Sequence, residues 1–418
     1  MRSPLQVLRL VARSPSARSK HRKRSNYIAV TPPSINSSLL PSSLLRPVRV
    51  DDRELFCRAR RVQRLQQLSR SSDNHSSTSL VSQGWRSRRQ KKGFELYTRQ
   101  CPISGDTNSA QSLPLLLDSE VLAVGNVACS IDQLALPLSS PSEGDYNSVM
   151  HSLYGSDFIY GSLVHKATFR RRSHKRGTDA IDKRVASIRQ GDDRSNQLLV
   201  KTSAFACTSM FDKKNQQMCY GELFSPTPSG GFSISTFSLA GQEVIAGKVR
   251  VPLRRTLHQL HPFSTWFSAE PASTGVHVIF RARFHRSESN GSCPPKVMNA
   301  HLWKLVQGVC KLEKLVDRRT EHCRELKIQT NYVAASGPRN SRCIVCTRTL
   351  NHIFMTRSCR RCELCSYNVC NECCSRQHVT ICNRHVTPLL VCTRCRERLA
   401  REDFDSQLRA VYSGSVSI

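Results

Sequence analysis

The sequence predicts an α+β fold in which an antiparallel sheet domain, closed by a long helix, precedes a small cysteine-rich finger. Three observations lead to this prediction. Apolar and polar residues alternate in several segments between residues 155 and 284, which is the period of a half-buried strand. An apolar stripe at helical spacing begins near residue 296, and four Cys-x-x-Cys pairs follow from residue 343.

Residues 1–80 form a basic segment that we expect to be disordered. No acidic residue precedes Asp51, and the low apolar content cannot offset the entropy of ordering the chain. Within this segment the apolar residues between Leu55 and Leu68 are spaced as in a short basic helix. The composition is also typical of a mitochondrial transit peptide, and residues 20–24 would suit a nuclear signal, so both addresses stay open.

The charge balance is strongly basic. The chain has 63 Lys and Arg residues against 31 Asp and Glu residues, which gives a formal net charge of +32. Such a balance attracts polyanions, either nucleic acid or the anionic cytoplasmic leaflet of a membrane. Solvated basic faces account for the same excess. No run of about 18 uninterrupted apolar residues occurs, so we expect no membrane-spanning helix.

Residues 81–328 are expected to form one domain. We predict strands over residues 155–169, 197–211, 232–239 and 275–284. The last of these is the clearest, because its alternate residues are apolar and would share one face. These residues are Val276, Val278, Phe280, Ala282 and Phe284.

A long amphipathic helix is predicted over residues 296–327. Its apolar stripe recurs at i, i+3, i+4 and i+7 and consists of Leu302, Leu305, Val306, Val309, Leu312, Leu315 and Val316. Packing against the sheet explains this stripe. The functional alternative is that the helix closes an apolar cavity in the sheet.

The four cysteine pairs are the most specific motif of the chain. They are Cys343/Cys346, Cys362/Cys365, Cys370/Cys373 and Cys392/Cys395. Two such pairs complete a tetrahedral Cys₄ site, so four pairs predict two zinc ions with no open coordination position. A disulfide framework is the alternative, but it needs a secretory signal, and Arg9 and Arg13 interrupt the apolar N-terminal stretch.

The spacing of the pairs resembles the FYVE family of zinc fingers. Four residues separate the second and third pairs, whereas a RING finger keeps this gap shorter and usually carries a His ligand, and a PHD finger expects His at position 370. The resemblance implies a cross-braced finger over residues 343–400. One zinc would be held by Cys343, Cys346, Cys370 and Cys373, and the other by Cys362, Cys365, Cys392 and Cys395. Cys359 competes with Cys362, because Cys359-x-x-Cys362 is itself a pair.

The finger departs from FYVE fingers that read phosphatidylinositol 3-phosphate. It lacks their Trp-x-x-Asp before the first pair and the His pair of their basic block, and Glu363 and Leu390 replace basic positions. Arg360 and Arg361 remain as weak candidates for a lipid headgroup. We therefore expect a degenerate finger that has general basicity and no phosphoinositide selectivity.

The domain before the finger resembles the START-like lipid-transfer fold, and the chain as a whole resembles oomycete-type proteins that join this domain to a FYVE-related finger. The resemblance rests on Trp85 in residues 84–99, and on Leu302 and Trp303 in residues 302–316. It implies a helix-grip: a curved antiparallel sheet wrapped on the C-terminal helix around an apolar pocket. Residues 329–342 would be a linker, and residues 401–418 a tail.

Together these patterns predict a non-enzymatic zinc-binding adaptor in the cytoplasm, peripheral on endomembranes. Its expected partners are an anionic membrane lipid at the finger, an apolar lipid in the START-like pocket, and a protein of unspecified kind. The sequence shows no Gly-x-Ser-x-Gly, phosphate loop or His-Glu-x-x-His. Two alternatives stay open: a nuclear zinc-finger protein that binds nucleic acid through basic surfaces, which is less favoured, and a RING-like ubiquitin ligase.

Overall fold

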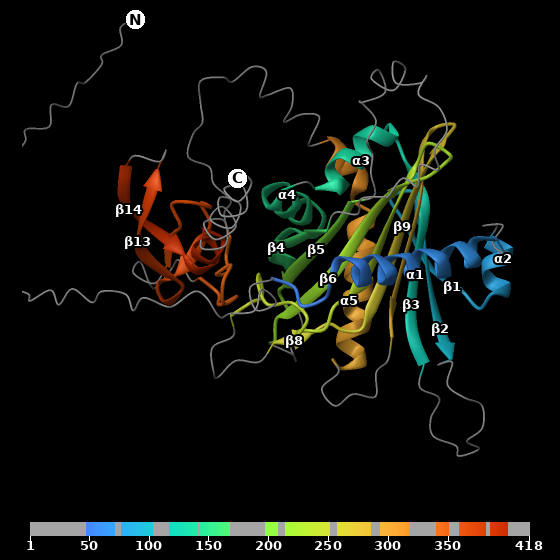
Figure 1. Cartoon of the computed structure of the whole chain (residues 1–418). Coiled ribbons are helices and arrows are strands. Elements are labelled where there is room, and N and C mark those ends of the chain that lie inside the picture. Colours follow the sequence, from blue (N-terminus) through green and yellow to red (C-terminus); the bar gives the residue numbers. More distant parts are fainter. Residues whose placement is uncertain are drawn as a thin grey trace, which may run out of the picture. The chain divides into compact units, whose positions relative to one another are not determined.

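A computed structural model provides the three-dimensional structure of the chain (Figure 1). The residues that it describes are 47–71, 77–102, 117–140, 142–167, 197–207, 214–250, 257–285, 293–317, 340–350, 359–381 and 385–399. None of the helices in these ranges is long and apolar enough to cross a bilayer.

A ten-stranded sheet forms the body of the domain (Figure 1). Its strands lie in the order β1-β2-β3-β10-β9-β7-β6-β5-β4, and each neighbouring pair is antiparallel. The short strand β8 pairs with β6 in parallel. The bounds are β1 Arg86–Lys91, β2 Phe94–Pro102, β3 Leu117–Val127, β4 Phe158–Ala167, β5 Gln197–Phe205, β6 Gln216–Pro226, β7 Phe232–Ser238, β8 His258–Gln259, β9 Phe263–Ala272 and β10 Gly275–Phe284.

The strand β10 has the bounds that the sequence predicts. It lies between β3 and β9, with Phe280 opposite Ala123 on one side and Phe267 on the other. Its five alternating apolar residues belong to the main core, and Ile279 on the opposite face is buried in a second cluster. Burial of both faces explains why an apolar residue interrupts the polar side of the pattern.

One face of the sheet packs on α5 (Pro295–Val309), which lies behind the strands in Figure 1. α3 (Ile131–Ser139), α4 (Glu143–Tyr154) and the short 3₁₀ turn η2 (Gly155–Asp157) extend this layer. All seven residues of the predicted apolar stripe are buried in the core between helix and sheet. The α+β helix-grip architecture expected from the sequence is therefore confirmed, whereas the apolar cavity stays a prediction.

The C-terminal helix is shorter than predicted. α5 ends at Val309, and a second helical segment covers residues 312–317. At the break the amide of Lys311 donates to the carbonyl of Gly308, three residues back, at 2.9 Å, and the Lys311 side chain donates to Leu153 of α4. α5 and the end of α4 lie close together at Gly308, because this residue has no Cβ. A Cβ there would lie 2.4 Å from the ring of Tyr154. The remainder of the predicted helix, residues 318–327, lies outside the described residues.

The other face of the sheet carries α1 (Asp52–Ser71), which crosses the strands in front in Figure 1. Leu55, Phe56 and Ala59 are buried against β5, β6 and β7 side chains, and Val48 just before the helix is buried with them. The prediction of disorder up to residue 80 is therefore wrong for residues 47–71, although the helical spacing there was recognised. Contacts with strands more than 100 residues away stabilise this segment, and such contacts leave no local signal.

The segment around Trp85, just before β1, also differs from the expectation. α2 (Ser77–Ser82) includes the last residues of the segment expected to be disordered, and the basic residues that follow Trp85 form the strand β1. The strand predicted over residues 232–239 is confirmed as β7, and the one predicted over 197–211 begins as predicted but ends at Phe205, with residues 208–211 outside the described ranges. The first predicted strand begins at Phe158, because η2 occupies the residues before it.

The cysteine-rich finger has little regular structure. It contains two small antiparallel hairpins, with a 3₁₀ turn between them and a short helix over residues 393–399. The bounds are β11 Cys359–Arg361, β12 Asn368–Cys370, η3 Asn371–Cys373, β13 Cys374–Ile381 and β14 His385–Cys392.

Candidate metal centres

The first sulfur group joins Cys343 and Cys346 to Cys370 and Cys373, and all four residues are buried. Cys343 and Cys346 lie in a tight turn in which the amide of Thr347 donates to the carbonyl of Cys343 at 2.8 Å. Thr347 has a φ of 59°, which closes this turn. Cys370 ends β12 and Cys373 ends η3, so the second pair comes from the middle of the finger, 24 residues beyond Cys346.

The second sulfur group joins Cys362 and Cys365 to Cys392 and Cys395. The first pair repeats the same turn: Ser366 has a φ of 61° and its amide donates to the carbonyl of Cys362 at 2.9 Å. Cys392 ends β14, and its amide lies 3.3 Å from the sulfur of Cys362. The two groups alternate along the chain, which is the cross-braced arrangement that the resemblance implied.

The geometry of both groups suits a tetrahedral metal. The sulfur atoms of each group lie within 4.8 Å of one another, with 3.6 Å between Cys346 and Cys370 and 3.9 Å between Cys365 and Cys392. Four sulfurs at about 2.3 Å from one zinc ion are about 3.8 Å apart. A disulfide needs about 2.0 Å, and the described cysteines are all free thiols. The disulfide alternative is therefore wrong for these residues, and the two groups can hold metal ions.

The ionisation of the thiols also favours a cation. A hydrogen bond from Cys346 lowers the pKa of Cys343 to about 2, and bonds from neighbouring thiols likewise lower the pKa of Cys362. The pKa values of Cys373 and Cys395 are raised, because each donates its proton to a neighbouring thiolate. Each group thus contains thiols that ionise readily and thiols that keep their protons, and a divalent cation would favour the thiolate form of all four.

The structure places Cys362 rather than its competitor Cys359 in the second sulfur group. Cys359 lies in β11 opposite Cys370 and belongs to neither group. Cys374, which begins β13, also lies outside both groups and points its sulfur at the carbonyl of Asn371 at 3.7 Å.

The two candidate headgroup residues are exposed, but each donates a hydrogen bond to another residue of the finger. Arg360 donates from Nε to the side chain of Asn371 at 3.2 Å, and Arg361 donates from Nε to the carbonyl of Ser366 at 3.0 Å. The Glu363 carboxylate accepts from the amide of Leu390, so the two departures from the FYVE pattern contact each other. Each of the two arginines thus has a hydrogen-bond partner within the finger itself.

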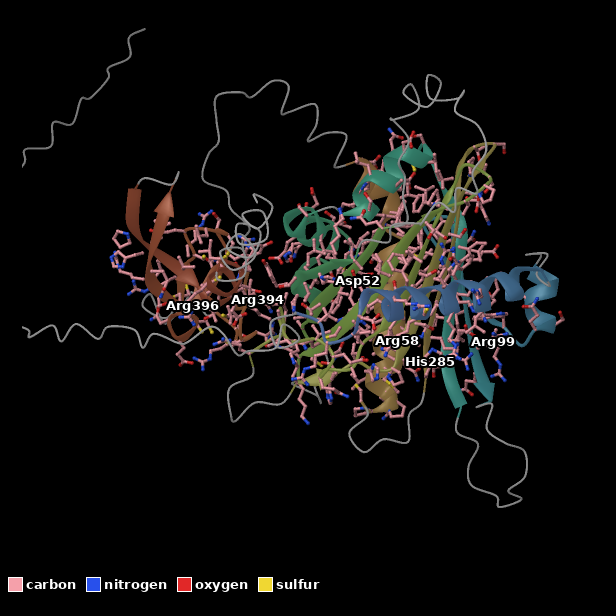
Figure 2. The ribbon with its side chains drawn as sticks, viewed as in Figure 1. Asp52, Arg58, Arg99, His285, Arg394 and Arg396 are labelled. Atoms are coloured by element: carbon pink, nitrogen blue, oxygen red, sulfur yellow. The ribbon has the colours of Figure 1, made fainter. Side chains whose placement is uncertain are left out.

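Arg394, between the last two ligands, joins both sulfur groups to the sheet (Figure 2). Its Nε donates to the carbonyl of Ile344, inside the first cysteine turn, at 2.7 Å. Another guanidinium nitrogen donates to Ser162 in β4 and to the carbonyl of Gly247, both at 2.8 Å. The guanidinium also lies 5.0 Å from the ring centre of Tyr160, and the residue is only 8% exposed. Sequence reasoning missed this residue, since its partners come from two distant segments.

Other contacts reinforce this finger–sheet contact. The amide of Arg250 donates to Val345 at 3.0 Å, and Asn215 donates to the hydroxyl of Thr347 at 2.9 Å. One apolar cluster contains finger residues together with Ile159, Tyr160, Ala204 and Ala206 of the sheet domain. The finger therefore shares its small core with the domain that precedes it.

The interior of the sheet domain holds a polar group that the sequence did not predict. The hydroxyls of Tyr146 and Tyr220 lie 2.7 Å apart, and that of Ser203 contacts both. Beside them Lys201 pairs with Glu222 at 2.5 Å and lies 4.8 Å from the Tyr146 ring centre. Burial raises the pKa of Tyr146, so its hydroxyl stays protonated and can donate.

His301 on α5 is the other polar residue of this interior. It is fully buried, and its ring nitrogen Nδ1 lies 2.8 Å from the amide oxygen of Gln216. Burial lowers the pKa of His301 to about 3, so the ring is neutral at physiological pH. It therefore acts as a hydrogen-bonding group rather than a charge.

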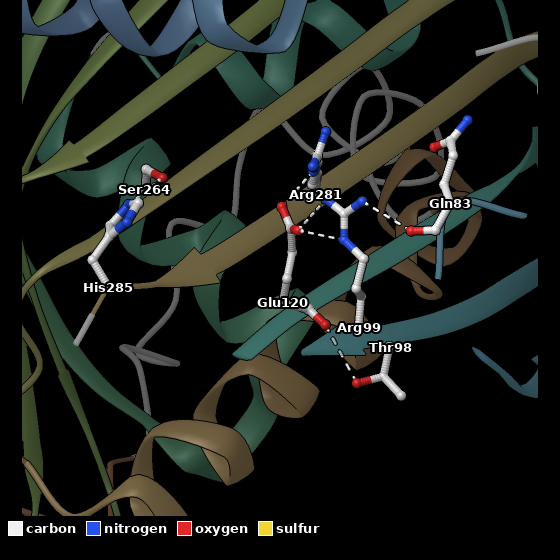
Figure 3. Close-up of polar contacts among 7 residues, drawn as sticks. All are labelled: Gln83, Thr98, Arg99, Glu120, Ser264, Arg281 and His285. Atoms are coloured by element: carbon white, nitrogen blue, oxygen red, sulfur yellow. Dashed lines mark hydrogen bonds and ion pairs between the residues drawn. The ribbon is translucent and has the colours of Figure 1, made fainter. Parts of the chain in front are cut away.

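Glu120 forms an ion cluster with Arg99 and Arg281 (Figure 3). Glu120 is 1% exposed and accepts from Arg99 at 2.8 Å and from Arg281. Burial opposes ionisation, but the two arginines outweigh it and lower the pKa of Glu120. Both guanidinium groups also face the ring of the buried Trp85, at 4.5 and 5.5 Å from its centre. Each of these two arginines thus has a buried carboxylate as its partner.

Comparisons with known proteins give similarity in structure alone. No family model and no curated protein matches the sequence. Among solved structures, the chain is similar to human StAR-related lipid transfer protein 5, at 12% identity and a TM-score of 0.37. That match covers 65% of this chain and 100% of the other.

Two further structures have comparable similarity. The STAR-related lipid transfer protein of Xanthomonas axonopodis is 11% identical with a TM-score of 0.34, and the match covers 56% of this chain and 99% of the other. The Zhui aromatase/cyclase of a Streptomyces species is 9% identical with a TM-score of 0.27, and the match covers 48% of this chain and 94% of the other.

Proposed function

We propose that the chain is a non-enzymatic zinc-binding adaptor, in which a START-like domain binds an apolar lipid and a FYVE-related finger serves membrane or protein docking. The observation that carries this proposal is the helix-grip sheet to which two Cys₄ groups are attached through Arg394. Sites with four thiolate ligands have no position left for a substrate, which supports a structural role for the metal.

The interior of the sheet domain supports lipid binding. Side chains of the main core are apolar over most of the surface between sheet and α5. The polar group around Tyr146, Ser203 and Tyr220 gives this interior one point at which a hydroxyl or carboxyl of a lipid could be recognised. Ligand sites commonly combine an apolar lining with a few such polar groups. Lys201 is paired with Glu222 and Tyr146 stays protonated, which favours binding over acid–base catalysis.

Native mass spectrometry of the full chain purified from cells tests both halves of this proposal. We expect a mass that corresponds to two zinc ions and one lipid molecule. The variant Cys362→Ser is the control for the metal, since it should lower the zinc content by one ion and leave the lipid bound. A protein that carries two zinc ions but takes up no lipid from mixed vesicles would contradict the lipid half alone.

The finger is expected to bind phosphatidylinositol 3-phosphate weakly or not at all, without preference over other anionic lipids. Charge-assisted bonds from Arg and His supply most of the affinity for a headgroup phosphate, and here Arg360 and Arg361 act without a His pair and beside Glu363. Flotation of the full chain with vesicles that differ only in phosphoinositide should give equal recovery. A preference for the 3-phosphate lipid that Arg361→Ala abolishes would show that the finger still reads its headgroup.

A further inference from the structure

The edge strand β1 carries an unusual concentration of exposed cations. Four of its six residues are basic, and Lys92 in the following turn adds a fifth. We call this surface the β1 basic edge; it consists of Arg86, Arg88, Arg89, Lys91 and Lys92. Residues 86–92 contain no acidic residue.

The backbone projects these side chains outward. β1 pairs only with β2, so it forms one edge of the ten-stranded sheet. The register of the pair shifts between Ser87 and Arg89, which places an extra residue in β1. The hairpin then turns through Lys92 and Gly93, both at positive φ, and this turn leaves Lys92 exposed at its tip.

The cations of the β1 basic edge have no carboxylate partner among the residues that the structure describes. Across the described ranges of the chain, none of its five side chains has a carboxylate within ion-pair distance. Arg99 on β2 and Arg281 on β10 differ, because both donate to the buried carboxylate of Glu120 (Figure 3).

More cations lie beside the turn of this hairpin. Burial lowers the pKa of Lys311, which follows α5, and the nearby charges of Lys91, Lys92 and Lys314 lower it further, against the opposite effect of Asp157. Residues more than 200 positions apart thus place like charges within electrostatic reach of one another. Such a cluster is unfavourable in the free protein and becomes favourable beside an anionic partner.

Charged residues also protect a sheet edge from pairing with other chains, and charges of either sign serve that purpose. The opposite edge of this sheet, β4, is covered by the finger, which contacts it through the hydrogen bond between Arg394 and Ser162. Edge protection therefore explains the presence of charge at β1 but not five cations of one sign.

We propose that the β1 basic edge, together with Val81, docks the protein on the surface of an anionic lipid bilayer. This goes beyond the proposed function, since the surface lies neither in the interior nor in the finger. Val81 on α2 is 61% exposed while its neighbour Leu80 is buried, so an apolar side chain stands beside the basic strand. Apolar side chains flanked by cations match the boundary between acyl chains and anionic headgroups.

A nucleic acid is the competing polyanion, and the surface suits it less well. Proteins that bind single strands stack bases on exposed aromatic rings. The aromatic residues nearest to this edge, Trp85, Phe94 and Tyr97, are each at most 3% exposed, and so offer no such platform.

Flotation of the zinc-loaded full chain with phosphatidylcholine vesicles, with and without phosphatidylserine, tests the proposal. The variant Arg86→Glu, Arg88→Glu, Arg89→Glu should bind the anionic vesicles at least about a hundredfold more weakly, because each lost cation costs about fivefold and each added carboxylate repels the surface. The matched control Arg60→Glu, Arg61→Glu, Arg64→Glu makes the same charge change on the exposed side of α1 and should bind within a few-fold of the unmodified protein. Val81→Ser should weaken binding a few-fold.

Equal losses in the two triple variants would overturn the proposal, because net charge alone would then explain binding. Unchanged flotation of the β1 variant would also overturn it, since another segment would then carry the membrane contact. So would β1-dependent binding of an RNA or DNA oligonucleotide by a protein that does not float. If the triple variant does not fold, the milder Arg88→Gln, Arg89→Gln pair should still lose about twentyfold. Loss of interior lipid with retained flotation would refute only the proposed function.

Discussion

Removing the metal ions is expected to unfold the finger while the sheet domain stays folded. Apart from its cysteines, the finger buries few apolar side chains: Ile344, Val345, Leu350, Val369 and Val391. Structural zinc contributes about 10–16 kcal/mol per site in finger peptides, so two sites together exceed what these five side chains supply at about 1.5–3 kcal/mol each. The main core between sheet and α5 contains no finger residue, so it survives the loss.

Hydrogen exchange with and without a strong chelator measures this effect. Amides of residues 340–350 and 359–399 should lose protection, whereas β10 should keep it. The strands β4 and β5 should lose part of theirs, because Ile159, Tyr160 and Ala204 pack against the finger. A finger that keeps its protection after complete metal removal would contradict the prediction.

A pair of variants separates the metal from the finger–sheet contact. Arg394→Met removes three hydrogen bonds to Ile344, Ser162 and Gly247 but no thiolate, so it should keep both zinc ions and loosen only β4. Arg396→Met is the matched control, because Arg396 is the exposed neighbour two residues further along the finger (Figure 2). This control should leave both the zinc content and the hydrogen exchange unchanged.

The parts of the fold that could be predicted are those with a local signal. The alternation in β10 and the stripe of α5 each follow from the period of one element, and the cysteine pairs follow from the short turns that present two sulfurs. The pairing of the first turn with Cys370 and Cys373 came from a family resemblance, since the spacing of one pair does not name its partner.

The missed features depend on contacts between distant segments. α1 looked disordered because its composition is basic, and its three buried residues are stabilised by strands β5, β6 and β7. Arg394 appeared as one basic residue among many, and only the fold shows that its partners are Ser162 and Gly247. The interior hydroxyl group likewise combines Tyr146, Ser203 and Tyr220 from three separate elements.

Replacing Val309 with Asp is expected to unfold the sheet domain. Val309 is the last residue of α5, is 6% exposed, and belongs to the core between helix and sheet. A carboxylate there would be buried among apolar side chains, and such substitutions cost more than about 4 kcal/mol. Domains of this kind have about 5–15 kcal/mol of stability in total, so the variant would lose a large part of its stability, and a domain at the lower end of this range would unfold.

Two further variants make the test of Val309 specific, with the free energy of unfolding measured in urea. Val309→Thr keeps the shape and adds one hydroxyl, so it should cost only about 1–3 kcal/mol. Asn299→Asp places the same carboxylate on the exposed side of α5, and it should change the stability by less than about 0.5 kcal/mol. If Val309→Asp unfolds at the same urea concentration as Asn299→Asp, the apolar stripe does not hold the helix against the sheet.

We expect the Val309→Asp variant to be far less stable than the Val309→Thr variant, and the latter to be less stable than the unmodified protein. That order would show that burial of this stripe decides whether the domain folds.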